Sequence, residues 1–356
     1  MKGIQLAVTL LLHAIAAHGS DITTKGTYDF VVSVPDVHGD LEALLRAMWM
    51  VRVEAVNEAD LKYEYFRQIF VSAIKEEKFT PISSPKDPRI LLIQTGDIID
   101  RGEASLSCYK AIWKVKAVLG WDVVNLVGNH EVMTIAGRAD HYAHADDVRE
   151  FGSKKARREA FSPGGSIWRR ITEEFQFLAR VNMGETESVL FVHAGLDSGW
   201  LKNLKLTNPL TVQSINELLM RELKLNPNSN LLTSSTSPIW TRDLANKHEK
   251  TVCDKMLPKI FDSLGGITRM VVGHTPQEQL VADAKCEAKL ILADVAMSRW
   301  MGSGKFGNPS AVIFSLENDG SQLSRIHAVY WRGATEKVFE QLIFQAPKDE
   351  IMSGEL

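Results

Sequence analysis

The stretch DVVNLVGNHE at residues 122–131 joins a short apolar run to a group of polar side chains. The run that ends at Val127 is rich in valine, which predicts a buried β-strand. Asn129, His130 and Glu131 follow where that strand would leave the core. Amides, imidazoles and carboxylates bind metal ions or transfer protons, so this stretch predicts a strand and one part of a chemical site.

Four other predicted strands also end in aspartate or histidine, usually beside a glycine. PDVHGD follows the run at 30–34, TGDIIDRG follows 90–94, HAG follows 189–192 and GHTP follows 270–272. In α/β proteins, sites gather at the carboxyl ends of strands, which would place all these groups on one edge. The residues concerned are Asp36, His38, Asp97, Asp100, Arg101, Asn129, His130, His193 and His274.

Helical patterns lie between several of these strands. They cover residues 40–56, 104–119, 166–178 and 212–223, and two more apolar runs, at 290–292 and 311–314, predict further strands. This alternation predicts an α/β fold whose sheet strands are buried on both faces.

Two polar stretches are predicted to be insertions. Residues 57–88 combine a charged, helix-compatible run with the loop TPISSPKDP, and residues 138–165 form a polar segment, expected to be mobile, over or beside the site. Within the second stretch, the pairs KK at 154–155 and RR at 157–158 predict a solvated face. A basic contact for an acidic substrate is the alternative.

The composition describes a globular protein with an unusual start. The chain has 356 residues, 45% of them hydrophobic, and its net charge of −3 gives no basic field for nucleic acid. Residues 1–19 combine Lys2 with an apolar stretch and then small residues, as in a secretory signal peptide. We therefore expect a protein of the secretory pathway, in the endoplasmic-reticulum lumen or secreted, without stable membrane insertion. A buried N-terminal strand or a weak anchor is the alternative.

The cysteines leave one question open. Cys108, Cys253 and Cys286 form neither a disulfide framework nor a Cys-x-x-Cys metal site. A secretory route would permit a bridge between Cys253 and Cys286, but the sequence alone does not decide it. Cys108 lies in a predicted helix and is expected to be buried and unreactive.

Carboxylates and imidazoles suit divalent manganese, iron and zinc. In two-metal sites the ions lie roughly 3.5–4 Å apart and lower the pKa of a bridging water, which yields a hydroxide nucleophile. The residue types therefore favour two divalent metal ions as cofactors.

The motifs DVHGD, GDIIDRG and GNHE, in that order and followed by HAG and GHT, resemble the signature of the PPP family of metal-dependent protein phosphatases. The resemblance covers residues 29–315. HAGL at 193–196, PIWTRD at 238–243 and the long spacer between the first two motifs are similar to the Shewanella-like phosphatases. The resemblance implies a calcineurin-like metallophosphoesterase fold, a central β-sandwich of mixed sheets flanked by helices. We place the catalytic domain at 28–330 and a C-terminal extension at 331–356.

The resemblance also implies a role for each residue of the metal site. Asp97 would bridge the two metals. Asp36 and His38 would hold the first ion. The second ion would be completed by Asn129, His193 and His274.

Other side chains would act on the substrate. The resemblance implies that His130 protonates the leaving oxygen and that Asp100 orients it. Arg101, Arg242 and Asn129 would bind the phosphate, because guanidinium groups meet phosphate oxygens with paired hydrogen bonds. Glu131 is expected to be a structural partner rather than a ligand.

The expected function is hydrolysis of phosphoserine and phosphothreonine in a phosphoprotein, with phosphotyrosine as a further substrate, by attack of a metal-bridging hydroxide. A phosphoesterase acting on dinucleoside polyphosphates or other small molecules is the alternative, and a non-catalytic binding module is a third. Three features depart from the family. Pro35 stands where glycine is usual, HAG at 193–195 stands where HGG is usual, and the stretch 294–307 replaces a region that carries a tyrosine near the phosphate. The residue on the leaving-group side therefore stays open.

Overall fold

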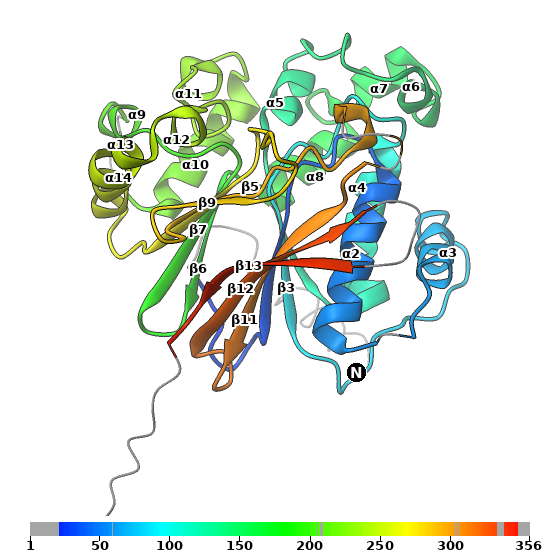
Figure 1. Cartoon of the computed structure of the whole chain (residues 1–356). Helices are drawn as coiled ribbons and strands as arrows, with labels where there is room; N and C mark the ends of the chain where they lie inside the picture. Colours follow the sequence, from blue (N-terminus) through cyan, green and yellow to red (C-terminus); the bar gives the residue numbers. More distant parts are fainter. Residues whose placement is uncertain are drawn as a thin grey trace, which may run out of the picture.

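The structure is a computed structural model that describes residues 21–347, apart from 59, 205, 207, 208, 303, 304, 306 and 333–337. Two β-sheets pack face to face and helices cover their outer sides, which confirms the predicted α/β sandwich (Figure 1). The six-stranded sheet has the order β1 (Ile22–Thr23), β6 (Leu178–Met183), β7 (Glu187–Val192), β8 (Arg269–Val272), β10 (Leu290–Leu292) and β9 (Asp283–Lys285). The seven-stranded sheet has the order β13 (Val338–Gln345), β12 (Gln322–Trp331), β11 (Ser310–Glu317), β2 (Phe30–Val34), β3 (Ile90–Gln94), β4 (Asp122–Leu126) and β5 (Phe175–Gln176).

Both sheets are mixed. In the larger sheet, β2, β3, β4 and β5 run parallel, whereas β11, β12 and β13 continue it in antiparallel pairs. In the smaller sheet, β7, β8 and β10 run parallel, β9 lies antiparallel to β10, and β6 lies antiparallel to β7 but parallel to β1. The parallel strands carry their carboxyl ends to a common edge, where the polar motifs follow.

The two sheets bury an apolar layer between them. Val31 and Ile93 of the larger sheet and Val271 of the smaller one belong to this layer and are inaccessible to solvent. The rings of Phe191 and Phe314 meet edge to face across it, with centroids 5.7 Å apart. Burial of apolar area at about 25 cal/mol per Å² is the main force that holds the sheets together.

The outer faces are covered by helices. Against the larger sheet lie α2 and α4, with α3 packed on both, and α10 packs on β6 of the smaller sheet. The side chain of Asp40 accepts a hydrogen bond from the Ala43 amide and so fixes the start of α2 directly after the first motif. The α-helices are α2 (Leu41–Val56), α3 (Tyr63–Ile74), α4 (Ser105–Leu119), α5 (Asn129–Ile135), α6 (Ala145–Glu150), α7 (Lys154–Phe161), α8 (Ser166–Glu174), α9 (Ser198–Lys202), α10 (Val212–Leu225), α11 (Asn230–Thr233), α12 (Asp243–Asn246), α13 (Glu249–Thr251) and α14 (Leu257–Leu264).

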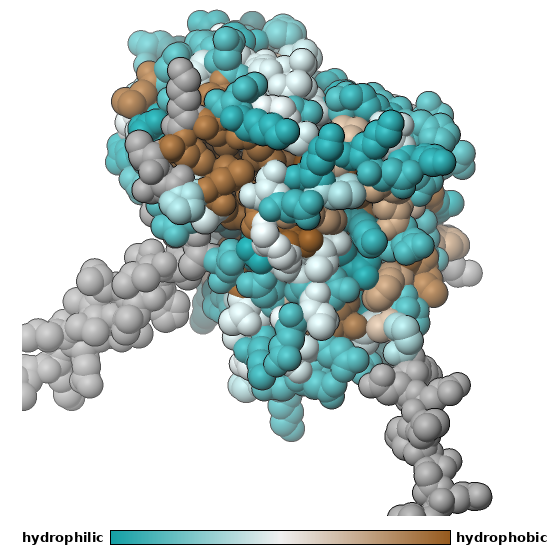
Figure 2. Space-filling view, turned by 90° about the vertical axis from the view of Figure 1, so that its left-hand side faces the viewer, coloured by the Kyte–Doolittle hydropathy of each residue, from teal (hydrophilic) through white to brown (hydrophobic). Residues whose placement is uncertain are grey.

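Helices also dominate the segment between β7 and β8. Figure 1 shows this segment, with α9 to α14, at the upper left of the molecule. Figure 2 views that side and shows apolar side chains gathered in its upper part, above a mostly hydrophilic lower part. No helix among the described residues is long and apolar enough to cross a bilayer.

Most predicted elements are present within a few residues of their expected bounds, and one prediction is wrong. The helix predicted at 166–178 ends at Glu174, because Phe175 and Gln176 pair with β4 and the chain then enters β6 at Leu178. The strands β12 and β13 were not predicted. The signal peptide predicted at 1–19 lies outside the described residues.

The two predicted insertions contain helices. Residues 57–88 include α3, whose apolar face is buried against the core, and residues 138–165 include α6 and α7. Cys253 and Cys286 form a disulfide bond, which resolves the pairing that the sequence left open. Cys108 is free and buried, as expected.

Candidate metal and catalytic site

The loops that follow five strands turn sharply and bring their polar side chains to one edge of the sandwich. His38, Asp97, Asp100, Arg101 and His274 all have positive φ, between 47° and 72°. This left-handed backbone is costly for residues with a side chain and collects at functional sites. It lets the loops after β2, β3 and β8 reverse direction at once, so that their side chains turn towards the site instead of pointing into solvent.

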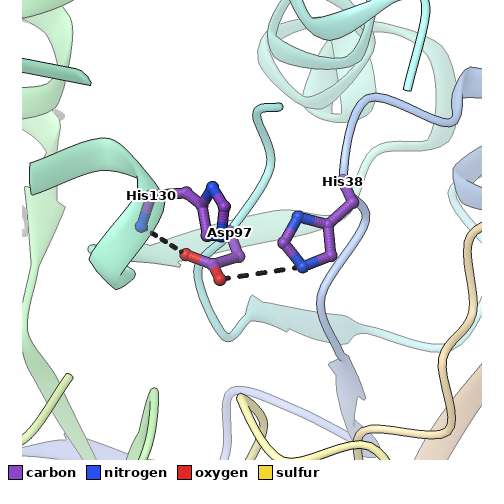
Figure 3. Close-up of side chains that lie close together, drawn as sticks. All are labelled: His38, Asp97 and His130. Carbon is purple, nitrogen blue, oxygen red and sulfur yellow. Dashed lines mark hydrogen bonds and ion pairs between the residues drawn. The ribbon is translucent and has the colours of Figure 1, made fainter. Parts of the chain in front are cut away.

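Asp97 lies at the centre of the site. Its Oδ2 is 3.8 Å from Nε2 of His38 and 3.5 Å from Nε2 of His193. Two clusters of potential ligands share this carboxylate: Asp97 with His38 and His130, and Asp97 with His193 and His274, each with ligand atoms within 4.8 Å of one another. Figure 3 shows the first cluster, in which the Asp97 carboxylate faces the amide of His130 and Nε2 of His38. The arrangement offers two adjacent cation positions on one shared aspartate.

Hydrogen bonds orient the imidazoles. Nδ1 of His38 lies 3.2 Å from the carbonyl oxygen of Ile99, and Nδ1 of His193 lies 2.8 Å from that of Thr95. A carbonyl can only accept, so each Nδ1 carries the proton and each Nε2 presents its lone pair to the site. Nε2 of His193 also lies 3.0 Å from Oδ1 of Asn129, so two predicted ligands of one metal converge.

The loops approach so closely because glycines stand at the contacts. A Cβ on Gly128 would lie 2.2 Å from Oδ1 of Asp97, and one on Gly273 would lie 2.3 Å from Oδ1 of Asp36. The carboxylate of Asp36 accepts hydrogen bonds from the His274 amide, with both oxygens 3.1 Å from that nitrogen. These contacts join the first and last motifs, which are 238 residues apart in the sequence.

Glu131 bonds the loop after β3 to the loop after β4. Its buried carboxylate accepts hydrogen bonds from the amides of Asp97, Ile98 and Gly128, all at 2.9 Å, and from the hydroxyl of Tyr109 at 3.1 Å. These contacts agree with the structural role that was expected for Glu131. Through them, one carboxylate fixes the two loops that carry Asp97 and Asn129.

The site concentrates buried carboxyl groups. Burial raises the pKa of Asp36 well above its usual range, and the nearby charge of Asp294 adds to the effect. Burial likewise raises the pKa of Asp97, with Glu131 as the next cause. Several buried carboxylates in contact are stable as anions only if cations compensate them.

The imidazoles of the site can act as neutral metal ligands. Burial lowers the pKa of His193 to about 3 and lowers the pKa of His274 further, so both rings are neutral. Nε2 of His274 is buried and has no hydrogen-bond partner among the described residues. Anionic oxygens, neutral imidazole nitrogens and an unpaired buried lone pair are the donors that divalent transition metals take, so the residues fit such ions.

His130 and Asp100 form a buried pair beside the shared aspartate. Nδ1 of His130 lies 2.8 Å from Oδ2 of Asp100, while its amide donates to Oδ1 of Asp97 at 2.9 Å. Burial lowers the pKa of this imidazole to about 3, and the positive charge of Arg101 adds to the effect. A carboxylate on Nδ1 fixes the ring and leaves Nε2 to exchange a proton.

Two guanidinium groups lie near this edge. Arg101 sits with its guanidinium carbon 5.2 Å from the ring centre of Tyr142, and its buried Nε has no partner among the described residues. Arg242 lies at the start of α12 with an exposed side chain. Burial raises the pKa of Asp294 to about 6, and the charges of Arg242 and Arg101 act to lower it, so both guanidinium groups lie near this carboxyl group.

Three residues of this region were missed or misread from the sequence. Asp294 follows the apolar run at 290–292, so the rule that placed the predicted site residues at strand ends could have found it. Tyr142 lies in the stretch expected to be a mobile insertion, yet its ring is 5.0 Å from that of His130. Arg157, expected on a solvated face, is buried and bonded to Asp100. No local signal marks either of the last two, because their partners are distant in the sequence.

A sandwich of mixed sheets with two ligand clusters on a shared aspartate defines a metal-binding hydrolase. The family profile for calcineurin-like phosphoesterases matches residues 31–278, and the chain belongs to this family.

Known relatives agree with this assignment. A protein of Schizosaccharomyces pombe is 26% identical over 322 residues, which cover 87% of this chain and 90% of the relative. The Shewanella-like protein phosphatase 1 of Plasmodium berghei is 22% identical over 77% of this chain and 69% of its own length. The cold-active protein-tyrosine phosphatase of a psychrophilic Shewanella species shares the fold, with a TM-score of 0.61 and 20% identity over 91% of this chain and 83% of that one. The resemblance to PPP-family phosphatases is thereby confirmed.

Proposed function

We propose that this phosphoesterase is a phosphoprotein phosphatase that hydrolyses phosphoserine and phosphothreonine monoesters, with phosphotyrosine as a further substrate. The observation that carries the proposal is the pair of ligand clusters on Asp97 beside the buried pair of His130 and Asp100. The protein phosphatases among the relatives support a protein substrate.

In this proposal, two divalent ions would share Asp97 as a ligand; Asp36 and His38 would hold the first ion, and Asn129, His193 and His274 would hold the second. Manganese, iron and zinc all suit these donors. Ions bound here would supply Lewis acidity that activates water and reduces charge on the phosphate oxygens.

The chain's own residues perform the remaining work. Arg101 and Arg242 bind phosphate oxygens, and Asn129 turns its amide towards the same group. His130, oriented by Asp100, gives the proton on Nε2 to the oxygen that leaves phosphorus. The two arginines hold the substrate so that this oxygen faces His130, because planar guanidinium groups bind phosphate in a fixed geometry.

A substrate panel tests the proposal. Purified protein with manganese should hydrolyse phosphopeptides, and Asp97→Asn should abolish the activity. Separate phosphoserine, phosphothreonine and phosphotyrosine peptides of one sequence determine the preferred alcohol. A higher kcat/KM for diadenosine tetraphosphate than for every peptide would replace this proposal by the small-molecule alternative.

We also propose that the protein works in the secretory pathway. The disulfide between Cys253 and Cys286 supports an oxidising compartment, and the segment 1–19 was predicted to be a signal peptide. Fractionation of cells that produce the chain with and without residues 1–19 checks this. A cytosolic location for both forms would contradict it.

A further inference from the structure

Arg157 stands out among the charged residues of α7 because it is buried. Its relative exposure is 2%, whereas the side chain of the adjacent Arg158 is 64% exposed and pairs with Asp140 at the surface. Nη2 of Arg157 donates to Oδ1 of Asp100 at 2.6 Å, and its Nε donates to Oδ2 of Asp147 at 2.8 Å. One guanidinium therefore joins two buried carboxylates.

The two oxygens of Asp100 have separate partners. Oδ2 faces Nδ1 of His130 at 2.8 Å, while Oδ1 accepts from Arg157. The carboxylate therefore cannot rotate without breaking one of two charge-assisted hydrogen bonds. Its orientation determines the orientation of the imidazole.

The hydrogen bonds around Arg157 form a closed network. The amide of Ser105 donates to Oδ1 of Asp147 at 3.0 Å, and the hydroxyl of Ser105 accepts from the amide of Asp100 at 3.2 Å. Asp147 holds the other end of Arg157. The start of α4, the loop after β3 and the segment 138–165 are thus tied together at Asp100.

We propose that Arg157 is a positioning residue for the proton donor of the reaction. Through Asp100 it keeps the His130 ring in the orientation in which Nδ1–H is bonded and Nε2 faces the leaving oxygen. When the P–O bond breaks, the departing oxygen keeps the electron pair and takes the proton that the imidazolium form of His130 carries on Nε2. The ring is left neutral with Nδ1–H bonded to Asp100, and it takes up a proton from water before the next turnover. The inference rests on the proposed function, in which His130 is the acid.

The polar segment 138–165 thereby gains a defined part in the reaction. It supplies Arg157 and Asp147 to the hydrogen-bond network and also places Tyr142 against the His130 ring. Figure 1 shows α6 and α7 side by side at the upper right, and α7 contacts α5, the helix that carries His130. The segment thus supports the proton donor both through Asp100 and through Tyr142.

The test compares two substitutions of neighbouring arginines. Arg157→Lys keeps a positive charge but cannot bond Asp100 and Asp147 in the same two-pronged way. Arg158→Lys is the matched control on the same helix, at an exposed position. Both variants and the wild type are assayed with manganese on phenyl phosphate, whose leaving group needs protonation, and on p-nitrophenyl phosphate, whose leaving group does not.

We expect Arg157→Lys to lower kcat for phenyl phosphate at least about tenfold, with KM changed less than about twofold, since general acid catalysis contributes about 10²–10⁴-fold. Its kcat for p-nitrophenyl phosphate should fall less than about threefold, and Arg158→Lys should change neither. An equal loss on both substrates would mean a merely structural role, and no loss on phenyl phosphate would mean no role; either overturns the proposal.

A second variant keeps the test decisive if Arg157→Lys does not fold. Asp147→Asn is isosteric, leaves the bond to Asp100 in place and releases only the far end of Arg157. It should show the same selective loss on phenyl phosphate, smaller in size, and an equal loss on both substrates would again overturn the proposal. Wild-type protein that hydrolyses neither aryl phosphate would instead contradict the phosphatase function itself.

Discussion

At the scale of single residues, His130 is the group whose loss should change the rate most selectively. Replacing it by asparagine removes the proton donor but no proposed metal ligand. We expect His130→Asn to lower kcat for a phosphopeptide by about 10²–10⁴-fold and to change KM little, because the proton is given only in the transition state. Steady-state kinetics check this, with His248→Asn as the control at an exposed histidine. A raised KM at unchanged kcat would assign His130 to substrate binding instead.

Gly128 permits a second prediction at this scale. An added methyl would lie 2.2 Å from Oδ1 of Asp97 and 2.4 Å from its amide nitrogen. We expect Gly128→Ala to displace the shared carboxylate and to destabilise the fold by about 1–3 kcal/mol through overpacking. Elemental analysis after dialysis should show less bound metal than in the wild type. Gly199→Ala, in α9, is the control and should keep its metal; equal metal in both variants would contradict the prediction.

Single residues also show how far sequence reasoning reaches. His193 and His274 could be predicted because each follows a short apolar strand and has a glycine within two residues, and the fold brings parallel strand ends together. Arg157 could not, because its sequence context, KKARRE, is that of an exposed helix. Its burial depends on Asp100, 57 residues away, and on Asp147. A local pattern carries no information about such a partner.

At the scale of elements, the disulfide joins the helical segment between β7 and β8 to the end of β9, the edge strand of the smaller sheet. Cys253 lies in a π-helical turn at Val252–Met256 before α14, and Cys286 follows β9. The bond closes a loop of 33 residues, for which chain entropy predicts about 3–4 kcal/mol of stabilisation.

We therefore expect Cys253→Ser with Cys286→Ser to unfold at lower denaturant concentration than the wild type. Dithiothreitol should lower the midpoint of the wild type and leave that of the double variant unchanged. The readout is equilibrium unfolding in urea. Cys108→Ala should respond to the reductant like the wild type, and a wild-type midpoint that ignores the reductant would contradict the prediction.

Two of the missed elements, β13 and β5, have identifiable and different physical causes. The strand β13 has only intermediate and exposed residues, and its longest apolar run is the three residues 342–344, since it lies at the sheet edge. The region 166–178 has a helical apolar pattern that continues past the true end of α8. Pairing with β4 turns Phe175 and Gln176 into a strand, which is a tertiary effect that local periodicity does not contain. Strands buried on both faces, such as β2 and β3, were found with their observed bounds.

At the scale of the whole molecule, His327 links stability to pH. This residue of β12 is 2% exposed, and neither ring nitrogen has a hydrogen-bond partner among the described residues. Its Nε2 lies 3.7 Å from Oε1 of Glu54. Burial, with the charge of Arg325 as the next cause, lowers its pKa to about 4. An unfolded chain would bind the proton at about pH 6.5.

The unfolded state thus takes up the proton first as the pH falls. The stability that comes from keeping His327 neutral is complete above about pH 6.5 and is lost as the pH approaches 4, by about 3 kcal/mol in total. Denaturant unfolding of the wild type and of His327→Leu at pH 7 and pH 4.5 measures this. The wild type should lose more stability than the variant between the two pH values, and equal losses would contradict the assignment.

The left-handed backbone at His38, Asp97 and His274 restricts how the chemistry of the site can be studied. At such positions a β-branched or bulky replacement introduces conformational strain of its own, whereas asparagine and aspartate adopt positive φ with little penalty. Replacement by valine or threonine would therefore mix a folding defect with the loss of a ligand. Asparagine is the replacement whose kinetics can be interpreted chemically, and a library screened for activity should recover few other residues there.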